Sequence, residues 1–418
     1  MRIAIIGSGI SGLTSAYLLK PHHDITVFEA EDRIGGHTAT KDVTVNGESY
    51  AIDTGFIVYN DWTYPNFIKL LTKLGVPTRP TTMGFSVSCD ATGLEYAGHS
   101  FSALFAQRSN LLRPSHLRML LDIVRFNKEA IADLESGKLL PDDTLGDYLT
   151  QRGYSEKFIS HYLVPMGSAI WSASSQDMLD FPLLFFVRFF KNHGLLSVKN
   201  RPQWRVISEG SRAYLEPLTA SFRNDIRVSS RISSVTRTSQ GVEVCIEGKQ
   251  AETFDQVVFA CHSSQALSMI KDPSNTERQV LEAIPYKNND VVLHTDERLL
   301  PKKKLTWSSW NYLLKKSRQP HEPAVLTYNM NILQCIKSPV TFCVTLNGTD
   351  HIDPSKILGR YQYEHPVFSL DSVAASAQWS RVNGVNRSWF CGAYWGNGFH
   401  EDGVVSALKV TQGLGGDW

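Results

Sequence analysis

The residues with the clearest chemical meaning lie near the start of the chain, in the run Gly7-Ser8-Gly9-Ile10-Ser11-Gly12. Three glycines at this spacing have distinct mechanical roles in a loop that holds a diphosphate. Gly7 permits a tight turn, Gly9 lets backbone amides approach the phosphates, and Gly12 allows a helix to pack closely. The amides of Ile10 and Ser11 would stand at the first turn of that helix, where the partial positive charge favours an anion.

The flanking elements must position these glycines. Arg2 to Ile6 predicts a buried parallel strand, and the apolar spacing from Leu13 to Leu19 predicts the helix that follows. Ile25 to Phe28 predicts the second strand, which ends at Glu29 and Ala30. A carboxylate at that place can accept hydrogen bonds from both ribose hydroxyls of an adenosine and would repel a 2'-phosphate. The sequence therefore predicts a dinucleotide-binding βαβ unit.

A second glycine pair follows the acidic residue, in the run Arg33-Ile34-Gly35-Gly36-His37-Thr38. Gly35 and Gly36 would let the backbone wrap the diphosphate from its other side, and Arg33 could offer a cationic fork to phosphate or ribityl oxygens. An ordinary NAD domain lacks such a segment. The combination favours FAD, while a protein that binds only NAD stays an alternative.

These motifs together resemble the flavin-containing amine oxidase superfamily, which includes monoamine and polyamine oxidases and phytoene-desaturase-like enzymes. The resemblance implies non-covalent FAD. It also implies further contacts with the cofactor. Thr54, Gly55 and Phe56 would pass near the flavin, Ile232 near the adenine, and Gly392, Glu401, Asp402 and Gly403 would form the closing segment. A helix from about Gly403 would direct its N-terminus at the flavin.

A closer resemblance covers essentially the whole chain. It is to bacterial proteins known as predicted NAD/FAD-binding proteins and to the N-terminal half of plant cyclopropane fatty acid synthases. Shared landmarks include Tyr64-Pro65-Asn66, His193-Gly194-Leu195-Leu196 and Ser309-Trp310-Asn311-Tyr312. This resemblance implies an apolar substrate, with a fatty acyl chain as one candidate, and a lipid methyltransferase as a candidate partner.

The expected fold class is α/β. The resemblance implies a Rossmann-type FAD-binding domain of amine oxidase or p-hydroxybenzoate hydroxylase-like topology, with an inserted α+β substrate domain. We expect residues 1–78, 200–267 and 383–418 to form the discontinuous FAD-binding domain. Residues 79–199, a helical insertion, and 268–382, a mixed sheet, would then form the substrate-binding domain.

The substrate-binding residues are less clear. Leu117 to Phe126 predicts a helix, and the aromatic run from Phe181 to Phe190 could line a tunnel, although packing within a helical core is the favoured interpretation. His294 follows an apolar stretch, and a structural histidine is favoured over a substrate contact. No catalytic residue is assigned.

Two departures from the family pattern weaken an amine-oxidase interpretation. The family's lysine, which reaches flavin N5 through a water, has no clear counterpart: Asn288 or Asn289 occupies that neighbourhood, and Lys287 lies beside them. The aromatic cage around an amine nitrogen is also unclear. Its nearest candidates are Tyr394, Trp395 and Phe399.

Composition excludes several other classes. The formal net charge of +1, with both signs interspersed, argues against nucleic acid as a partner. The six cysteines include no CxxC pair, so neither a disulfide framework nor a metal site is expected. No leader precedes the first strand and no transmembrane segment is expected, so a cytoplasmic location is favoured, with peripheral membrane contact left open.

Three functions follow as hypotheses. The first is an FAD-dependent oxidoreductase that moves a hydride between flavin N5 and a carbon of an apolar organic substrate. The second is a flavin amine oxidase that produces peroxide. The third is a non-catalytic flavoprotein partner of a lipid methyltransferase.

Overall fold

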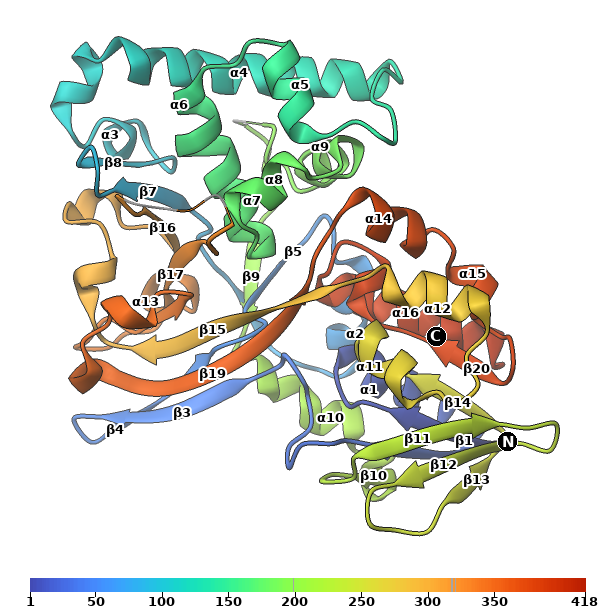
Figure 1. Cartoon of the computed structure of the whole chain (residues 1–418). Coiled ribbons are helices and arrows are strands. Elements are labelled where there is room, and N and C mark those ends of the chain that lie inside the picture. The colour runs from blue at the N-terminus through green and yellow to red at the C-terminus, as the bar shows by residue number, and fades with distance from the viewer. Residues whose placement is uncertain (198, 317–318, 320) are drawn as a thin grey trace.

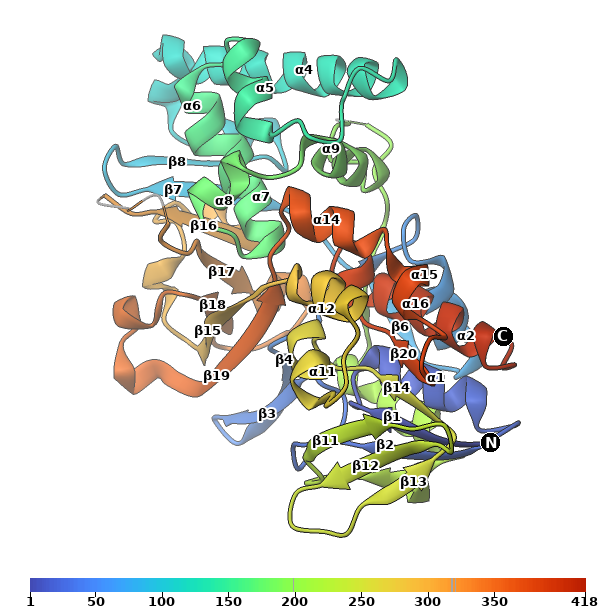
Figure 2. The same ribbon diagram turned by 45° about the vertical axis from the view of Figure 1, so that its right-hand side comes forward.

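The computed structural model describes residues 1–197, 199–316, 319 and 321–418. Figure 1 shows a parallel sheet with both chain termini beside it, a second large sheet next to it, and a layer of helices at the far end of the molecule. Figure 2 shows the same order of layers after rotation, with α4 and α5 furthest from the parallel sheet. The α/β fold class predicted from the sequence is confirmed.

The parallel sheet carries the predicted βαβ unit. Its side chains alternate between two cores: Ile3 and Ile5 face the helices, whereas Ala4 and Ile6 face a small antiparallel sheet. All four are at most 5% exposed, so the strand is apolar from Ile3 to Ile6 and only its first residue, Arg2, is charged and exposed. In order across the sheet the strands are β10 (Ile226–Arg227), β2 (Asp24–Phe28), β1 (Arg2–Ile6), β14 (Gln256–Phe259) and β20 (Ser388–Phe390).

Two helices cover the first of these faces. The helix α1 (Ile10–Leu19) follows the glycine turn, and α16 (His400–Gly413) packs along it. The α16 helix begins at His400, earlier than the predicted start at Gly403, because Asp402 accepts a hydrogen bond from the backbone N–H of Phe399 at 2.9 Å and so caps the first turn. The small antiparallel sheet on the other face consists of β11 (Ile232–Arg237), β12 (Val242–Ile246) and β13 (Glu252–Phe254).

The second large sheet is mixed, and two of its strands extend toward the parallel sheet. These are β15 and β19, which pair antiparallel along their whole length and form the long ribbon that crosses Figure 1. In order the strands are β19 (Ile357–Pro366), β15 (Tyr286–His294), β18 (Cys343–Leu346), β17 (Val325–Asn329), β16 (Trp310–Leu314), β7 (Phe85–Cys89) and β8 (Leu94–Ala97).

Short strands link the two large sheets. One hairpin turns at Asn46-Gly47, where both residues have positive φ, 52° and 84°, as a two-residue hairpin turn requires. The strands are β3 (Thr40–Val45) with β4 (Glu48–Asp53), and β5 (Val58–Asn60), β9 (Trp204–Ile207) and β6 (Thr78–Pro80).

The helical layer contains the aromatic run predicted to pack or to line a tunnel. Most of these aromatic side chains pack in the core of the layer, since Phe186, Phe189 and Phe190 of α9 are at most 4% exposed. The helices of this layer are α3 (Phe101–Leu104), α4 (Pro114–Glu135), α5 (Leu145–Gln151), α6 (Glu156–Phe158), α7 (Val164–Trp171), α8 (Ser175–Leu179) and α9 (Leu183–Asn192). The other α-helices are α2 (Pro65–Lys73), α10 (Leu215–Thr219), α11 (Ser263–Met269), α12 (Asn275–Glu282), α13 (Met330–Leu333), α14 (Leu370–Ser376) and α15 (Trp379–Val382).

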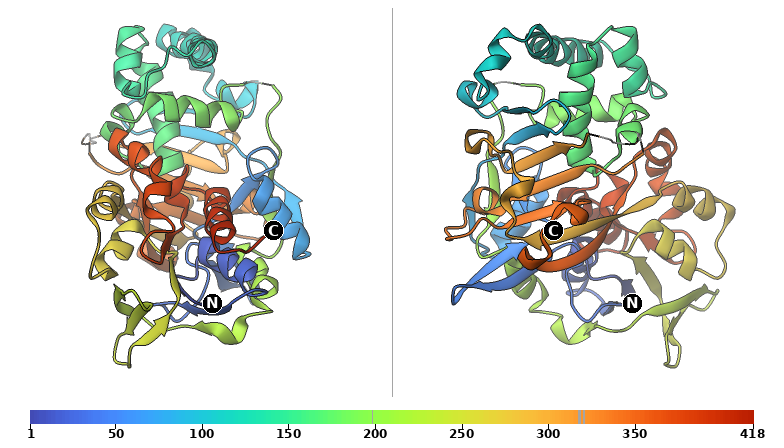
Figure 3. Two further views of the ribbon diagram at one scale, coloured as in Figure 1. Left: turned by 90° about the vertical axis from the view of Figure 1, so that its right-hand side faces the viewer. Right: turned by 60° about the vertical axis from the view of Figure 1, so that its left-hand side comes forward.

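The views in Figure 3 place the parallel sheet and its helices at one end and the helical layer at the other. The strands of the parallel sheet all fall within residues 1–78, 200–267 and 383–418. We propose that these segments form the FAD-binding domain and that 79–199 and 268–382 form the substrate-binding domain.

Candidate functional site

The glycine turn after β1 is built so that two of its glycines cannot be replaced. A Cβ on Gly7 would lie 2.6 Å from the carbonyl oxygen of Ala260, and one on Gly12 would lie 2.0 Å from that of Gly7. Gly9 differs, because a Cβ there meets no atom within 4 Å and its φ of −70° suits any residue. The turn therefore leaves open space beside Gly9.

The N-terminus of α1 opens onto this space. Among the described residues no side chain caps the helix, and its first turn carries no acid. The backbone N–H groups in the first turn of a helix have no partner within the helix, so those of Ile10, Ser11 and Gly12 can bind an anion. Glu29, at the end of β2, accepts hydrogen bonds from the backbone N–H and the hydroxyl of Ser8, at 3.0 and 2.6 Å.

The second glycine pair lies against the first turn. The backbone N–H of Gly35 donates to the Ser8 carbonyl at 2.9 Å, and a Cβ on Gly36 would lie 3.3 Å from the Cα of Gly9. The guanidinium of Arg33 donates to the carbonyl of Gly36 at 3.0 Å and so fixes this loop.

The segment 54–56 approaches the same loop. The backbone N–H of Phe56 donates to the His37 carbonyl at 2.8 Å, and a Cβ on Gly55 would lie 2.2 Å from that oxygen. Thr54 donates to the Ala39 carbonyl at 3.0 Å. The structure therefore brings together residues 7–12, 35–38 and 54–56, which we call the cofactor cradle.

The closing segment reaches the cofactor cradle through α16. The His400 ring stacks on Phe56 with 3.5 Å between centroids, and its Nε2 lies 3.1 Å from the hydroxyl of Thr38. A Cβ on Gly403 would lie 2.8 Å from the side chain of Ile10, so this glycine lets α16 approach α1.

Other predicted cofactor residues have protein partners. The carboxylate of Glu401 accepts hydrogen bonds from the backbone N–H groups of Asn66 and Phe67, at 3.1 and 2.8 Å, and so caps α2. Asp402 caps its own helix, and burial raises its pKa to about 6. The backbone N–H of Gly392 donates to Ser406 at 2.9 Å. Ile232 is 7% exposed and packs in the core that contains Phe28, while Ala30 is exposed.

The cofactor cradle fits a flavin dinucleotide. It offers an uncapped helix N-terminus, open space at Gly9, and the ring of His37, whose buried Nε2 has no hydrogen-bond partner among the described residues. Cys391 is buried, and burial raises the pKa of its thiol to about 12. A thiol in that state is a poor nucleophile, which agrees with a non-covalent cofactor.

Three histidines gather at the edge of the cofactor cradle. The His37 ring centroid lies 5.7 Å from that of His365 and 6.3 Å from that of His262. Burial lowers the pKa of His37 to about 3 and that of His365 to about 4. Burial also lowers the pKa of His262, although Glu364 accepts a hydrogen bond at 2.9 Å and opposes the shift. We infer that the cluster is uncharged at neutral pH.

This cluster predicts loss of stability in mild acid. An imidazole titrates near pH ~6.5 when unfolded, so the stability that buried neutral histidines contribute is present above that pH and lost as the pH falls toward their folded pKa. His37 and His365 each contribute about 2 kcal/mol less to the free energy of unfolding at pH ~5 than at pH ~7. Burial raises the pKa of Asp53 to about 6, which offsets part of the loss.

Urea unfolding at saturating cofactor, followed from pH 7 to pH 5, would measure this effect. We expect the free energy of unfolding to fall, and a His365→Gln variant to show a shallower fall because it removes one proton-binding site. A variant whose pH dependence matched that of the unaltered chain would contradict the assignment.

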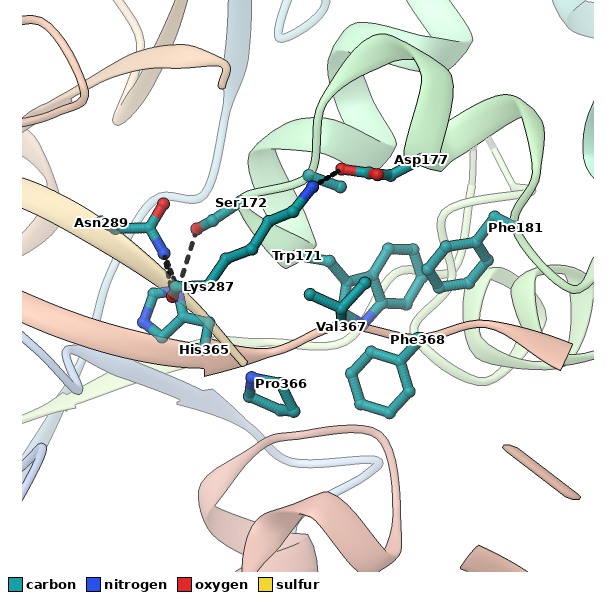
Figure 4. A pocket seen from close by; sticks show the side chains of 11 residues that line it. Trp171, Ser172, Asp177, Phe181, Lys287, Asn289, His365, Pro366, Val367 and Phe368 are labelled. Atoms are coloured by element: carbon teal, nitrogen blue, oxygen red, sulfur yellow. Dashed lines mark hydrogen bonds and ion pairs between the residues drawn. The ribbon is translucent and has the colours of Figure 1, made fainter. Parts of the chain in front are cut away.

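A pocket adjoins the histidine cluster at the end of the β15–β19 ribbon (Figure 4). His365 belongs to both, since it lines the pocket and its ring neighbours that of His37. The pocket and the cofactor cradle therefore lie on either side of this pair of rings. Its lining consists of Trp171, Ser172, Ala173, Asp177, Phe181, Lys287, Asn289, His365, Pro366, Val367 and Phe368.

The polar groups of the pocket lie along one side. Nδ1 of His365 accepts a hydrogen bond from the amide of Asn289 at 3.3 Å and lies 3.0 Å from the hydroxyl of Ser172. Lys287 extends across the pocket to Asp177, with 2.5 Å between the charged atoms (Figure 4). Burial opposes ionisation of Asp177, but hydrogen bonds from Lys287 and Ser174 overcome it and lower its pKa.

The aromatic groups of the pocket lie on the other side. The Trp171 ring centroid is 4.5 Å from that of Phe181 and 6.5 Å from that of Phe368. The predicted aromatic run thus contributes Phe181 to the pocket, while its α9 residues form the core behind it. These rings give that side of the pocket an apolar surface.

Several residues of the pocket were not predicted from the sequence. His365, Trp171 and Ser172 stand in no motif, and only the folded chain places them beside the cradle. His262 could have been found, because it follows the strand that ends next to Gly7 in the parallel sheet.

Other candidates lie outside the pocket. His294 is fully buried and structural, since its Nδ1 accepts from the backbone of Asp296 at 3.0 Å and its Nε2 lies 2.7 Å from the Thr345 hydroxyl. The cage candidates Tyr394, Trp395 and Phe399 do not line the pocket as the described residues form it.

Two further features of the chain bear on other functions. In the described part of the chain, no helix has the length and apolar character needed to cross a membrane. The same residues contain no group of three or more His, Cys, Asp or Glu side chains placed to hold a metal ion.

The comparisons identify relatives. A protein of Mycobacterium tuberculosis named as a flavin-containing monoamine oxidase, AofH, is 26% identical over 289 residues, which cover 65% of this chain. The chain spans 59% of the length of that relative. Cyclohexylamine oxidase from Brevibacterium oxydans IH-35A has a TM-score of 0.69 at 15% identity, with 99% of each chain covered.

A fatty acid isomerase from P. acnes that produces CLA has a TM-score of 0.71 at 15% identity, with 98% of each chain covered. Likeness at this identity shows a shared fold. The model of the family described as flavin containing amine oxidoreductase matches residues 10–330, which is most of the chain. The protein therefore belongs to the flavin containing amine oxidoreductase family.

Proposed function

We propose that the protein transfers a hydride between FAD and a carbon of an apolar organic substrate, with a fatty acyl chain as the leading candidate. The observation that carries the proposal is the aromatic pocket, which His365 joins to the cofactor cradle. The structural likeness to a fatty acid isomerase agrees with this substrate class.

The residues of the chain position the reactants. Trp171, Phe181 and Phe368 provide apolar surface that holds a hydrocarbon chain and removes water from it. The N-terminus of α1 would hold the diphosphate, and Glu29 the ribose. FAD, when bound, supplies the two-electron chemistry. Because His37 and His365 are uncharged at neutral pH, they add no positive charge where the pocket adjoins the cofactor cradle.

An amine oxidase that releases peroxide is the second candidate, because the relatives include AofH and cyclohexylamine oxidase. A cationic amine needs an unpaired carboxylate or an aromatic cage in the pocket. Asp177 is already paired with Lys287, and the cage candidates lie elsewhere. These features favour the apolar substrate.

A non-catalytic flavoprotein that partners a lipid methyltransferase has no support from the pocket or from the relatives. A cytoplasmic location remains part of the proposal.

Two substrates that differ only in their head group can distinguish the fatty acyl oxidoreductase from the amine oxidase. Oleic acid and oleylamine would each be added anaerobically to the purified holoprotein, and loss of the oxidised flavin absorbance followed. We expect the acid or its thioester to bleach the flavin. Bleaching by oleylamine alone, with peroxide release in air, would establish the amine oxidase instead. No bleaching by any of these lipids would contradict both enzymatic assignments.

A further inference from the structure

The helix α4 carries apolar side chains on two opposite faces. His116, Met119 and Phe126 are buried against the helical layer. On the outer face Leu117, Leu121 and Val124 recur at helical spacing and are 40%, 66% and 61% exposed. An outer face of a helix is ordinarily polar, so this stripe is not explained by the fold.

Neighbouring segments carry further exposed apolar side chains. The 3₁₀ turn η1 (Arg108–Leu112) leads into α4 and exposes 87% of Leu112. In α3, Phe101 is 74% exposed. Phe105 links the two elements, because its ring lies 4.9 Å from Phe101 and 5.8 Å from His116 of α4. The turn η6 (Lys304–Thr306) packs against α3 and exposes 55% of Leu305. We call these exposed residues the outer apolar face.

Basic residues lie close in sequence to the outer apolar face, and one of them, Arg118, is paired with Asp122 at 3.3 Å. The sequence has no Asp or Glu between Glu95 and Asp122, whereas Arg108, Arg113 and Arg118 fall in this interval. Lys302, Lys303 and Lys304 flank Leu305 and are exposed. Glu95 is buried and accepts the backbone N–H groups of Lys302 and Lys303, at 2.9 and 3.0 Å, which fixes the lysine turn beside α3.

We propose that the outer apolar face docks on a lipid bilayer that contains anionic headgroups. Exposed leucines with a basic rim fit such a surface, because the apolar side chains enter the acyl boundary while lysine and arginine meet the headgroup charges. A symmetric dimer through the same face would oppose two positive rims and repel. The charge therefore distinguishes a membrane from a second copy of the chain.

The position of the face agrees with docking. Figures 1 and 2 place α4 at the end of the molecule furthest from the parallel sheet, so the cofactor cradle stays clear of the bilayer. The docking is peripheral and does not depend on which substrate the pocket accepts.

Vesicle flotation of the holoprotein tests the proposal. We expect binding to phosphatidylcholine vesicles that contain phosphatidylglycerol, and binding about tenfold weaker to phosphatidylcholine alone. Leu112→Ser/Leu121→Ser should weaken binding about a hundredfold. Lys302→Gln/Lys303→Gln should weaken it about tenfold and reduce its salt dependence. The matched control is Leu358→Ser/Val385→Ser, which alters apolar side chains 39% and 40% exposed on other elements and should bind normally.

Thermal unfolding and flavin content of each variant verify that the fold is retained. Absence of binding to either vesicle would overturn the proposal. So would equal losses in the leucine variant and its control. Concentration-dependent dimerisation that the leucine variant abolishes, without vesicle binding, would assign the face to a second copy and also overturn it.

Discussion

Replacing Gly9 by valine is expected to give a folded but colourless protein. The residue has a φ of −70°, and a Cβ there meets no atom of the chain within 4 Å, so the substitution strains nothing in the protein. The added methyl groups would instead fill the space beside the α1 N-terminus, where a diphosphate must approach the backbone.

The expected loss of FAD affinity is large. The valine would push the diphosphate out of hydrogen-bond reach of the first-turn amides, and loss of two or three charge-assisted hydrogen bonds costs about 3 kcal/mol or more, which is at least a hundredfold in affinity. Titration of the apoprotein with FAD, followed by flavin fluorescence, measures this loss. The unfolding temperature of the apoprotein should stay within a few degrees of the unaltered value.

Gly12→Val is the matched control for this variant. Its Cβ would lie 2.0 Å from the Gly7 carbonyl oxygen, so it should damage the turn itself and lower the stability of the apoprotein. A Gly9→Val protein that purified with a full complement of flavin would contradict the location of the diphosphate. Equal destabilisation by both valines would contradict the claim that Gly9 faces open space.

The parts of the site that the sequence predicted are local ones. The strand, glycine turn, helix and acid from Arg2 to Glu29 form one βαβ unit, in which spacing alone determines the geometry. The second glycine pair was also predictable, because it follows that unit directly. The predicted start of α16, at about Gly403, was three residues too late. The helix begins at His400 because the Asp402 carboxylate caps it at Phe399, and such a cap depends on side-chain geometry.

The pocket could not be predicted in the same way. Ser172, Asn289 and His365 are more than seventy positions apart, and their hydrogen bonds arise only when α7 meets the β15–β19 ribbon. Ser172 also adopts a positive φ of 53° just after α7, which no residue pattern indicates. Glu401 shows the converse case. It stands in a recognisable motif, yet both its oxygens accept donors from α2.

Replacing Val367 by tryptophan is expected to abolish reduction of the flavin by substrate while leaving flavin binding intact. The side chain lines the pocket between Trp171 and Phe368 (Figure 4), and its backbone N–H keeps its hydrogen bond to the Pro285 carbonyl at 2.8 Å whatever the side chain. An indole there would occupy the volume that the proposed hydrocarbon chain needs. Since productive hydride transfer requires close alignment, we expect the rate of anaerobic flavin reduction to fall about a hundredfold or more.

Val385→Trp provides the control, because Val385 is 40% exposed and lies outside the pocket. It adds the same side chain, and the reduction rate should not change. Flavin content and unfolding temperature must match in the two variants, so that a loss of rate reports the pocket and not the fold. If Val367→Trp reduced its flavin as fast as the control, the substrate would have to reach the flavin by another route, and the pocket would lose its assigned role. Because the rate is measured with the substrate that bleaches the unaltered protein, this conclusion holds for a lipid and for an amine alike.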